Sequence, residues 1–189
     1  MRIVAGTHRT RRLLGPTSKE IRPTIDRVRE SIFNALGQRC ENLSVIDLFA
    51  GTGAMALEAL SRGAPSALLV DSALEAVRLC KQNVSNLELK ARSEIWHMDV
   101  FLAMSRCKTQ GRRFELAFAD PPYAFQNWEK LFSSLLEEEL LSPGGRLIVE
   151  RSKRCSLPAL PGALRLQKEL KLGDTVVSIL LHSADQPHT

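Results

Sequence analysis

Short apolar runs alternate with amphipathic segments through most of this chain. The amphipathic segments repeat apolar residues every three or four positions, which is the spacing of a buried helix face. Continuous apolar strands that alternate with helices are typical of a parallel sheet covered on both faces and connected by right-handed crossovers. The predicted strands are residues 45–50, 67–71, 94–98, 114–119 and 146–150, and the predicted helices are residues 24–36, 54–62, 74–84 and 128–141.

The two ends of the chain depart from this alternation. Residues 164–172 and 175–181 flank Gly173-Asp174 and predict an antiparallel hairpin that closes the sheet edge. Residues 2–6 and 12–15 resemble two short strands around a basic turn. We therefore expect an α/β fold with a doubly wound, mostly parallel sheet, an antiparallel C-terminal hairpin and a short basic N-terminal β-hairpin/helix extension. The expected divisions are an extension at 1–22, a main domain at 23–184 and a flexible tail at 185–189.

Composition excludes several classes of protein. With 189 residues, 44% hydrophobic and 25% charged, the chain is expected to form an ordinary globular domain. No apolar run approaches the roughly 18 residues of a membrane-spanning helix, and the N-terminus lacks a secretory signal pattern, so a cytoplasmic protein is expected. The cysteines lie too far apart in sequence for a metal motif; no metal site is expected, and Cys80 is predicted to lie on a buried helix face. The four are Cys40, Cys80, Cys107 and Cys155.

The positive charge is concentrated at one end. Residues 1–30 contain eight Lys and Arg and three acids, which accounts for the whole net charge of +5. Such a region attracts a polyanion such as nucleic acid, although a solvated basic surface has the same composition. Helical spacing predicts that Arg27 and Arg29 project away from the apolar stripe of their helix. The candidate RNA contacts are Arg9, Arg11, Arg12 and Arg27.

Acidic residues stand at the carboxyl ends of four predicted strands. In a parallel sheet of this kind, ligands bind beyond those ends. One such carboxylate is more often the cap of the next helix, but four on one edge favour a binding site. The four are Asp47, Asp71, Asp99 and Asp120.

A glycine loop, Asp47-Leu-Phe49-Ala50-Gly51-Thr-Gly53, follows the first predicted strand. The two glycines allow a sharp turn and are expected to bring backbone N–H groups close to a ligand. The pattern also loosely matches a dinucleotide-binding fingerprint, with Asp71 twenty residues beyond Gly51. In either interpretation the Asp71 carboxylate accepts hydrogen bonds from a ribose diol.

The sequence Asp120-Pro121-Pro122-Tyr123 is the more discriminating motif. Two prolines make a rigid corner and leave a peptide carbonyl without neighbouring N–H donors. The Asp120 carboxylate and that carbonyl then form a pair of acceptors beside an aromatic ring. Such a pair can grip the exocyclic amine of a nucleobase and turn its lone pair toward an electrophile, while the ring stacks on the base.

These motifs resemble those of S-adenosylmethionine-dependent amino-methyltransferases. The run Arg22-Pro-Thr24-Ile-Asp-Arg-Val-Arg-Glu, with the opening Arg2-Ile-Val-Ala-Gly, is similar to the bacterial 16S ribosomal RNA guanine-N2 methyltransferases of the RsmD type. The resemblance spans residues 2–181 and implies a Rossmann-like class I methyltransferase fold, with S-adenosyl-L-methionine as cofactor. It further implies a protein that acts on 16S rRNA, within an assembling or assembled small ribosomal subunit. A monomer is expected because the sequence shows no unusually apolar surface stripe. Glutamate is common in this family where Asp71 stands.

The resemblance also implies roles for individual residues. The catalytic corner would be Asp120, Pro121, Pro122 and Tyr123, with Asp120 ionised at neutral pH because its reference pKa is about 3.9. The cofactor-binding set would be Asp47, Phe49, Ala50, Gly51 and Gly53 toward the methionyl part, Asp71 at the ribose, Asp99 with Val100 at the adenine, and Arg22 with Thr24 bordering the methionyl end.

Three other functions remain open from the sequence. A DNA adenine-N6 or cytosine-N4 methyltransferase also uses an Asp-Pro-Pro-Tyr corner, but no separate base-recognition domain is evident. A nicotinamide dehydrogenase fits the glycine loop and Asp71 but gives the corner no role. A noncatalytic RNA-binding or ribosome-assembly factor on the same fold would not need Gly51, Gly53 and Asp120 intact.

Overall fold

The computed structural model describes residues 1–15, 23–122 and 124–183, without the side chains of residues 23–25. The chain divides into two compact units, Met1–Val100 and Phe101–Thr189. The predicted tail at 185–189, and residues 16–22 of the predicted N-terminal extension, lie outside the described residues.

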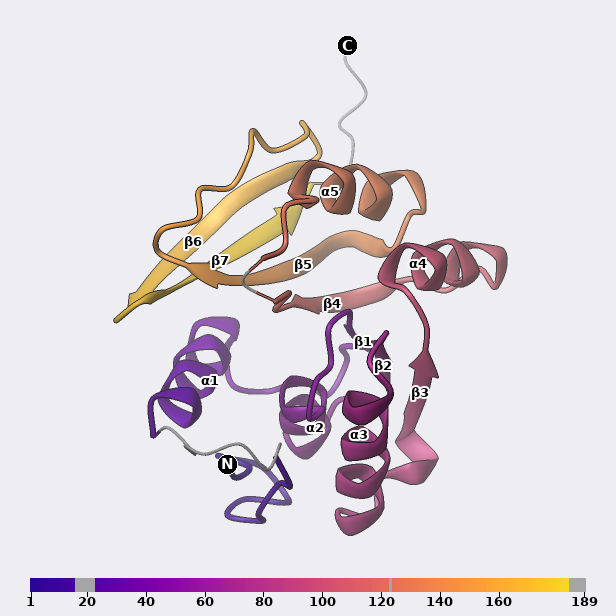
Figure 1. Cartoon of the computed structure of the whole chain (residues 1–189), viewed down its shortest axis with the longest axis vertical. Helices are drawn as coiled ribbons and strands as arrows, with labels where there is room; N and C mark the ends of the chain where they lie inside the picture. The colour runs from indigo at the N-terminus through magenta and orange to yellow at the C-terminus, as the bar shows by residue number, and fades with distance from the viewer. Residues whose placement is uncertain (16–22, 123, 184–189) are drawn as a thin grey trace. The chain divides into compact units, whose positions relative to one another are not determined.

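The first unit has a parallel sheet in the order β3-β2-β1. Its strands are β1 (Val45–Asp47), β2 (Ala67–Asp71) and β3 (Ser93–His97), and a short 3-10 helix, η1 (Lys90–Arg92), precedes β3. Helix α2 (Ala54–Ser61) packs against β1 and β2, and α3 (Leu74–Asn86) packs against β2 and β3 (Figure 1). The predicted alternation of strand and helix is therefore confirmed here.

Helix α1 (Pro23–Leu36) begins one residue before the predicted start. Proline suits the first helical position because its missing N–H has no partner there in any case, so Thr24 lies inside the first turn of the helix. The apolar stripe is buried as predicted, through Val28, Ile32, Phe33 and Leu36.

The prediction for Arg29 was wrong. Arg27 is exposed, but Arg29 is 2% exposed and pairs with the buried Glu58 of α2. Apolar periodicity could not predict the burial of Arg29, because it does not show where a buried carboxylate lies that can pair with the guanidinium.

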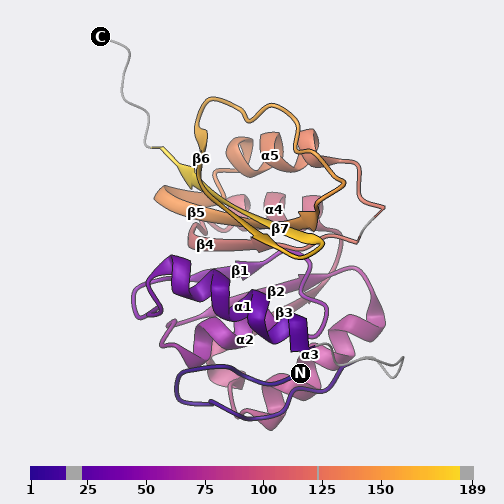
Figure 2. The same cartoon turned by 90° about the vertical axis from the view of Figure 1, so that its left-hand side faces the viewer.

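Residues 1–14 form an N-terminal arm that lies with α1 and α2 in the first unit (Figure 2). The predicted hairpin is present in a short form. Arg2 and Arg12 make an antiparallel bridge, the Ile3 N–H donates to the Arg11 carbonyl at 2.9 Å, and the Leu13 N–H donates to the Met1 carbonyl at 3.1 Å. The main-chain N–H groups of Val4 and Ala5 bond to a side chain of α2 instead of to the opposite limb of the arm. The arm is therefore a short hairpin that also bonds to a helix through its first limb.

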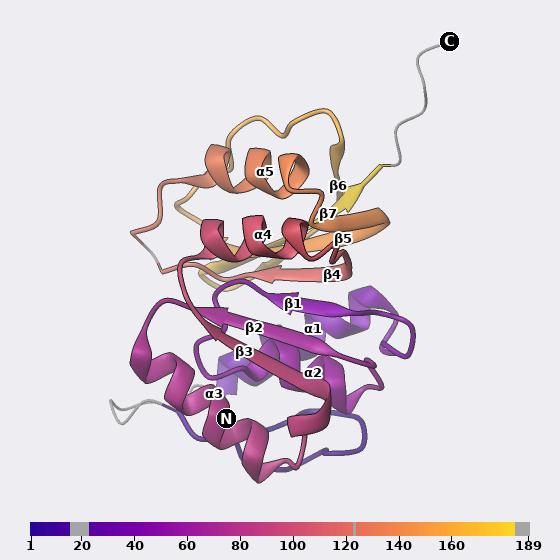
Figure 3. The same cartoon turned by 90° about the vertical axis from the view of Figure 1, so that its right-hand side faces the viewer.

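The second unit has a mixed sheet in the order β4-β5-β7-β6, in which β4 and β5 are parallel and the last two strands are antiparallel. The predicted C-terminal hairpin is thus confirmed, with β6 at the edge. Helices α4 and α5 lie on the same side of β4 and β5 (Figure 3). The elements are α4 (Val100–Thr109), β4 (Phe114–Ala119), α5 (Trp128–Glu137), β5 (Leu141–Ser152), β6 (Leu164–Leu172) and β7 (Thr175–His182).

Several boundaries differ from the prediction. Helix α4 was not predicted, although its buried Val100, Ala103, Met104 and Cys107 have helical spacing. Helix α5 ends at Glu137 and not at residue 141, because Glu139 has a φ of 49°, outside the helical region. Strand β5 begins five residues early, at residue 141, and β1 is only three residues long, since the chain turns away into the glycine loop.

The structure also bears on the predictions about Cys80, metal sites and membrane-spanning helices. Cys80 lies on the buried face of α3, as predicted. Within the described residues, no group of three or more His, Cys, Asp or Glu side chains is arranged to hold a metal ion. The same part of the chain contains no helix with the length and apolarity needed to cross a membrane.

Packing of α1 predicts the effect of one truncation. Phe33 is fully buried, and the Arg62 guanidinium lies 4.6 Å from its ring centroid. We expect Phe33→Ala to lower the free energy of unfolding by about 3–5 kcal/mol in urea titration, because it leaves a cavity and removes the cation–π contact. The exposed neighbour Asn34 provides the control, and Asn34→Ala should change it by less than about 0.5 kcal/mol. Equal effects would contradict the assigned helix face.

Candidate functional site

Three of the predicted acids gather at the carboxyl edge of the first unit's sheet. In the register, Asp47 at the end of β1 is level with Leu69, and Asp71 at the end of β2 is level with His97 of β3. Asp99 follows β3 by two residues. Asp47 is 2% exposed, Asp71 is half-buried and Asp99 is exposed. For these three carboxylates the prediction of a shared edge is confirmed, whereas Asp120 belongs to the second unit and its place at this edge stays a prediction.

Asp71 fixes the glycine loop to the end of β2. Its Oδ2 accepts a hydrogen bond from the Gly51 N–H at 2.8 Å, and its Oδ1 accepts one from the Ala73 N–H at 2.8 Å. The Ala50 N–H also donates to the Val70 carbonyl at 2.9 Å. Each carboxylate oxygen keeps further lone-pair capacity, so Asp71 can brace the loop and still accept from a ligand.

The glycine N–H groups both donate hydrogen bonds within the protein. Gly51 donates to Asp71, and the Gly53 N–H donates to the Ala50 carbonyl at 2.7 Å inside the turn. These two N–H groups are thus used within the protein, and the approach of backbone N–H groups of the loop to a ligand stays a prediction. The two bonds close the loop, which holds its backbone rigid.

The two glycines are required for different reasons. Both have positive φ, 54° at Gly51 and 80° at Gly53. A Cβ at Gly53 would lie 2.9 Å from Leu69 Cδ2, whereas a Cβ at Gly51 would meet no atom of the described residues within 4 Å. Gly53 thus serves packing, and Gly51 leaves open space beside the Asp71 carboxylate, where a ligand can approach the main chain closely.

The electrostatic character of this edge is negative. The Cys80 thiol donates to the Gly51 carbonyl at 3.3 Å. Its pKa is raised well above the ordinary value, first by burial and then by the charges of Asp47 and Asp71. Since both carboxylates act on the loop, the site favours a ligand that brings positive charge or hydroxyl donors. The same effect keeps Cys80 protonated and unreactive.

The remaining predicted cofactor residues differ in burial, and not all of them are described. Phe49 is half-buried, Ala50 is buried in the loop, and Val100 is buried at the start of α4. Arg22 lies outside the described residues, and the side chain of Thr24 is not described.

The proline corner ends β4 in the second unit. Asp120 follows the last strand residue, Pro121 is buried and Pro122 is exposed. The Pro122 carbonyl accepts from the Phe125 N–H at 2.8 Å, so the Pro121 carbonyl is the candidate for the free main-chain acceptor. Tyr123 lies outside the described residues.

The Asp120 carboxyl group is a weaker acid than its type predicts. Part of the residue faces solvent, but protein atoms crowd the carboxyl group, and this desolvation raises its pKa to about 6. The reference value of about 3.9 used for the sequence was therefore too low, although about nine in ten such groups are still ionised at pH 7. Asp120 is placed to act as a charged acceptor that titrates just below neutrality.

The candidate RNA contacts are exposed but not equivalent. Arg9, Arg12 and Arg27 are exposed. Arg11 is exposed too, but its Nη2 donates to the Asn86 carbonyl at the end of α3, at 2.7 Å. Arg11 therefore serves partly to hold the arm in place.

The glycine loop yields a test of these assignments. Gly51→Ala should lower the free energy of unfolding by about 1 kcal/mol, the cost of positive φ for a residue with a Cβ. Gly53→Ala should lower it by about 2–4 kcal/mol, because the added methyl also collides with Leu69. Urea denaturation of the two variants makes the comparison, and equal losses would mean that Gly53 is not tightly packed.

Comparison with known proteins places the chain. The Bacillus subtilis protein named putative rRNA methyltransferase YlbH is 32% identical over 179 residues, covering 95% of this chain and 97% of that protein. The Escherichia coli protein named ribosomal RNA small subunit methyltransferase D is 30% identical over 184 residues, covering 97% of this chain and 91% of that protein. A solved structure of a putative methyltransferase from Escherichia coli matches with a TM-score of 0.86 at 28% identity, covering 98% of this chain and 99% of that chain.

The likeness to that solved structure confirms the predicted methyltransferase fold. Residues 1–181 match the family described as Conserved hypothetical protein 95. The predicted resemblance to the RsmD-type methyltransferases is thereby confirmed, and the chain belongs to this family.

Proposed function

We propose that this protein transfers a methyl group from S-adenosyl-L-methionine to the exocyclic N2 amine of a guanine in 16S rRNA. The observation that carries the proposal is the Asp71-braced glycine loop with open space at Gly51, in a chain that also ends β4 with an Asp-Pro-Pro corner. The names of the relatives, rRNA methyltransferase and small-subunit methyltransferase D, support an RNA substrate. These names disfavour two of the alternatives left open by the sequence, a nicotinamide dehydrogenase and a noncatalytic RNA-binding factor.

The residues of the first unit fit this cofactor. S-adenosylmethionine supplies an activated methyl group on a sulfonium, so the protein's task is positioning and electrostatics. The remaining lone pairs of Asp71 accept from the ribose hydroxyls, and the buried Asp47 supplies negative charge toward the cationic methionyl part. Asp99 and Val100 border the adenine in this proposal. Arg22 and Thr24 are assigned to the methionyl end from the sequence resemblance alone.

The corner acts on the target amine. The ionised Asp120 carboxylate and the Pro121 carbonyl each accept one N–H of the guanine amine, which turns the nitrogen lone pair out of conjugation. The guanine is rotated out of its stack at a cost of a few kcal/mol, and stacking on Tyr123 offsets about 1–3 kcal/mol of it. As the N–C bond forms, the bond between the methyl group and the sulfonium would break and release the neutral thioether. The amine proton then passes to water, and the negative charge of Asp120 favours that loss electrostatically.

A methyl-transfer assay tests the whole proposal. Labelled cofactor is incubated with small ribosomal subunits that lack the modification, with naked 16S rRNA and with duplex DNA, and the modified nucleoside is mapped by mass spectrometry. N2-methylguanosine in 16S rRNA is the expected product, with assembled subunits the better substrate. Label only in DNA adenine or cytosine would establish the DNA methyltransferase instead.

The raised pKa of Asp120 predicts a pH dependence. The carboxylate form exists above pH about 6 and is lost as the pH falls, so kcat/KM should fall about tenfold per unit below pH 6. Asp120→Asn keeps one acceptor oxygen but cannot titrate. We expect Asp120→Asn to have much lower activity, and its kcat/KM should no longer fall below pH 6. Asp120→Ala should lose nearly all methyl transfer and retain cofactor binding. If kcat/KM of Asp120→Asn still falls below pH 6, the titrating group is a residue other than Asp120.

The exposed arginines of the arm predict a salt effect. Replacing Arg9 and Arg12 with alanine should weaken RNA binding and reduce the slope of log K against log salt by about 1–2, since each phosphate contact contributes about 0.7–0.9. Calorimetry should show the same cofactor affinity for variant and wild type. If the slope stays the same, these arginines form a solvated surface and not an RNA contact.

A further inference from the structure

A fully buried carboxylate, Glu58, is not used by the proposed chemistry. It lies in α2, in the otherwise apolar stretch Ala54-Met-Ala-Leu-Glu58-Ala-Leu, and is 0% exposed. Burying an ionised carboxylate costs several kcal/mol unless charged and hydrogen-bonding partners surround it. The identity of those partners indicates what the residue is for.

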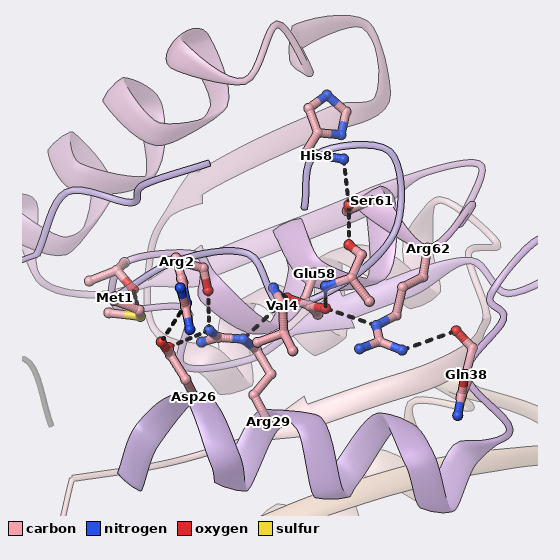
Figure 4. Close-up of polar contacts among 12 residues, drawn as sticks. Met1, Arg2, Val4, His8, Asp26, Arg29, Gln38, Glu58, Ser61 and Arg62 are labelled. Atoms are coloured by element: carbon pink, nitrogen blue, oxygen red, sulfur yellow. Dashed lines mark hydrogen bonds and ion pairs between the residues drawn. The ribbon is translucent and has the colours of Figure 1, made fainter. Parts of the chain in front are cut away.

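Four donors converge on the Glu58 carboxylate (Figure 4). Oε2 accepts from the Val4 N–H at 2.8 Å and from Arg29 Nε at 3.3 Å. Oε1 accepts from the Ala5 N–H at 2.9 Å and from Arg62 Nε at 2.9 Å. Two of the four donors are main-chain groups of the N-terminal arm, so Glu58 binds the arm by its backbone.

Arg29 extends this network to both sides. Its Nη2 donates to the Arg2 carbonyl of the arm and to Asp26 Oδ1, the latter at 2.8 Å. Asp26 Oδ2 also lies 3.8 Å from Arg2 Nε. The arm is thereby fixed between α1 and α2, as the dashed contacts of Figure 4 show.

Ser61, one turn after Glu58, holds the bend of the arm. Its Oγ donates to the Ala5 carbonyl at 2.6 Å and accepts from the His8 N–H at 3.0 Å, while its carbonyl accepts from the Thr7 N–H at 2.8 Å. Gly6 passes so close that a Cβ there would lie 1.9 Å from the Ser61 carbonyl oxygen, and its φ is +80°. No other residue type fits this contact.

The second limb of the arm is tied to the glycine loop. The fully buried Asn83 of α3 accepts from the Leu14 N–H at 2.7 Å. Its Nδ2 donates to the Leu14 carbonyl at 3.0 Å and to the Thr52 carbonyl at 2.9 Å, between the two glycines. The arm is therefore fixed at both limbs, and the exposed Arg9 and Arg12 project from a segment with little freedom.

We propose that Glu58 is a positioning residue for RNA binding, which holds the N-terminal arm in a preformed conformation that presents Arg9 and Arg12 to RNA phosphates. A preformed arm binds more tightly because its ordering entropy is lost on folding and not on binding. The inference rests on the proposed function, since it names how that function's substrate is held.

Gly6→Ala tests this with no change to Glu58 or to α2. The added methyl must separate the arm from Ser61, so trypsin should cut after Arg9 and Arg12 much faster than in the wild type. The KM for 16S rRNA substrate and the Kd for unmodified 16S rRNA should rise about tenfold, with a shallower salt slope. The kcat and the cofactor Kd should stay within about twofold, a split that general destabilisation would not give.

Two further variants complete the experiment. Gly15→Ala is the matched control, because a Cβ there meets no described atom within 4 Å, and it should behave as wild type. Glu58→Gln keeps the shape but removes the charge, and it should reproduce the KM effect; if it does not fold, Gly6→Ala carries the test alone.

The outcomes separate this inference from the proposed function. An unchanged trypsin pattern in Gly6→Ala, or a freed arm with an unchanged KM and Kd for RNA, overturns the positioning role. A wild-type protein that neither binds nor methylates RNA overturns the proposed function instead, while its arm would still resist trypsin relative to Gly6→Ala.

Discussion

The first unit is organised around a negative charge that water cannot reach. Two guanidinium groups and two main-chain N–H groups replace the solvent around Glu58, and charge-assisted bonds of this kind are about twice as strong as neutral ones. Removing one partner would leave a buried charge uncompensated, so α1, α2 and the N-terminal arm depend on one another. The arm has little apolar surface of its own to bury, apart from Ile3 and Leu13. Its attachment is therefore polar and directional.

The sequence was sufficient for most of the fold because periodicity reports burial directly. Strands β2 and β4 have the predicted limits, since each is a continuous apolar run between polar residues. Periodicity does not report tertiary contacts: the first limb of the N-terminal arm bonds to α2, and Arg29 is buried against Glu58. A lone glutamate in an apolar helix was the available signal for both.

The sequence predicted which residues lie at the candidate site but not the hydrogen bonds that they make. The positions of Asp47, Asp71 and Asp99 follow from the rule that parallel strands end at one edge. That Asp71 accepts a hydrogen bond from the Gly51 N–H depends on how the loop lies against the end of β2. The pKa of Asp120 likewise depends on how many protein atoms surround it, which no reference value contains.

The edge strand β6 limits how copies of this protein can meet. Among the described strands none pairs with the outer side of β6, and that side would offer main-chain groups to another strand, which is the usual route to sheet-to-sheet aggregation. Arg165, Lys168 and Lys171 are all exposed on this strand. Bringing two such edges together would place these like charges close to one another, which disfavours pairing between copies at this edge.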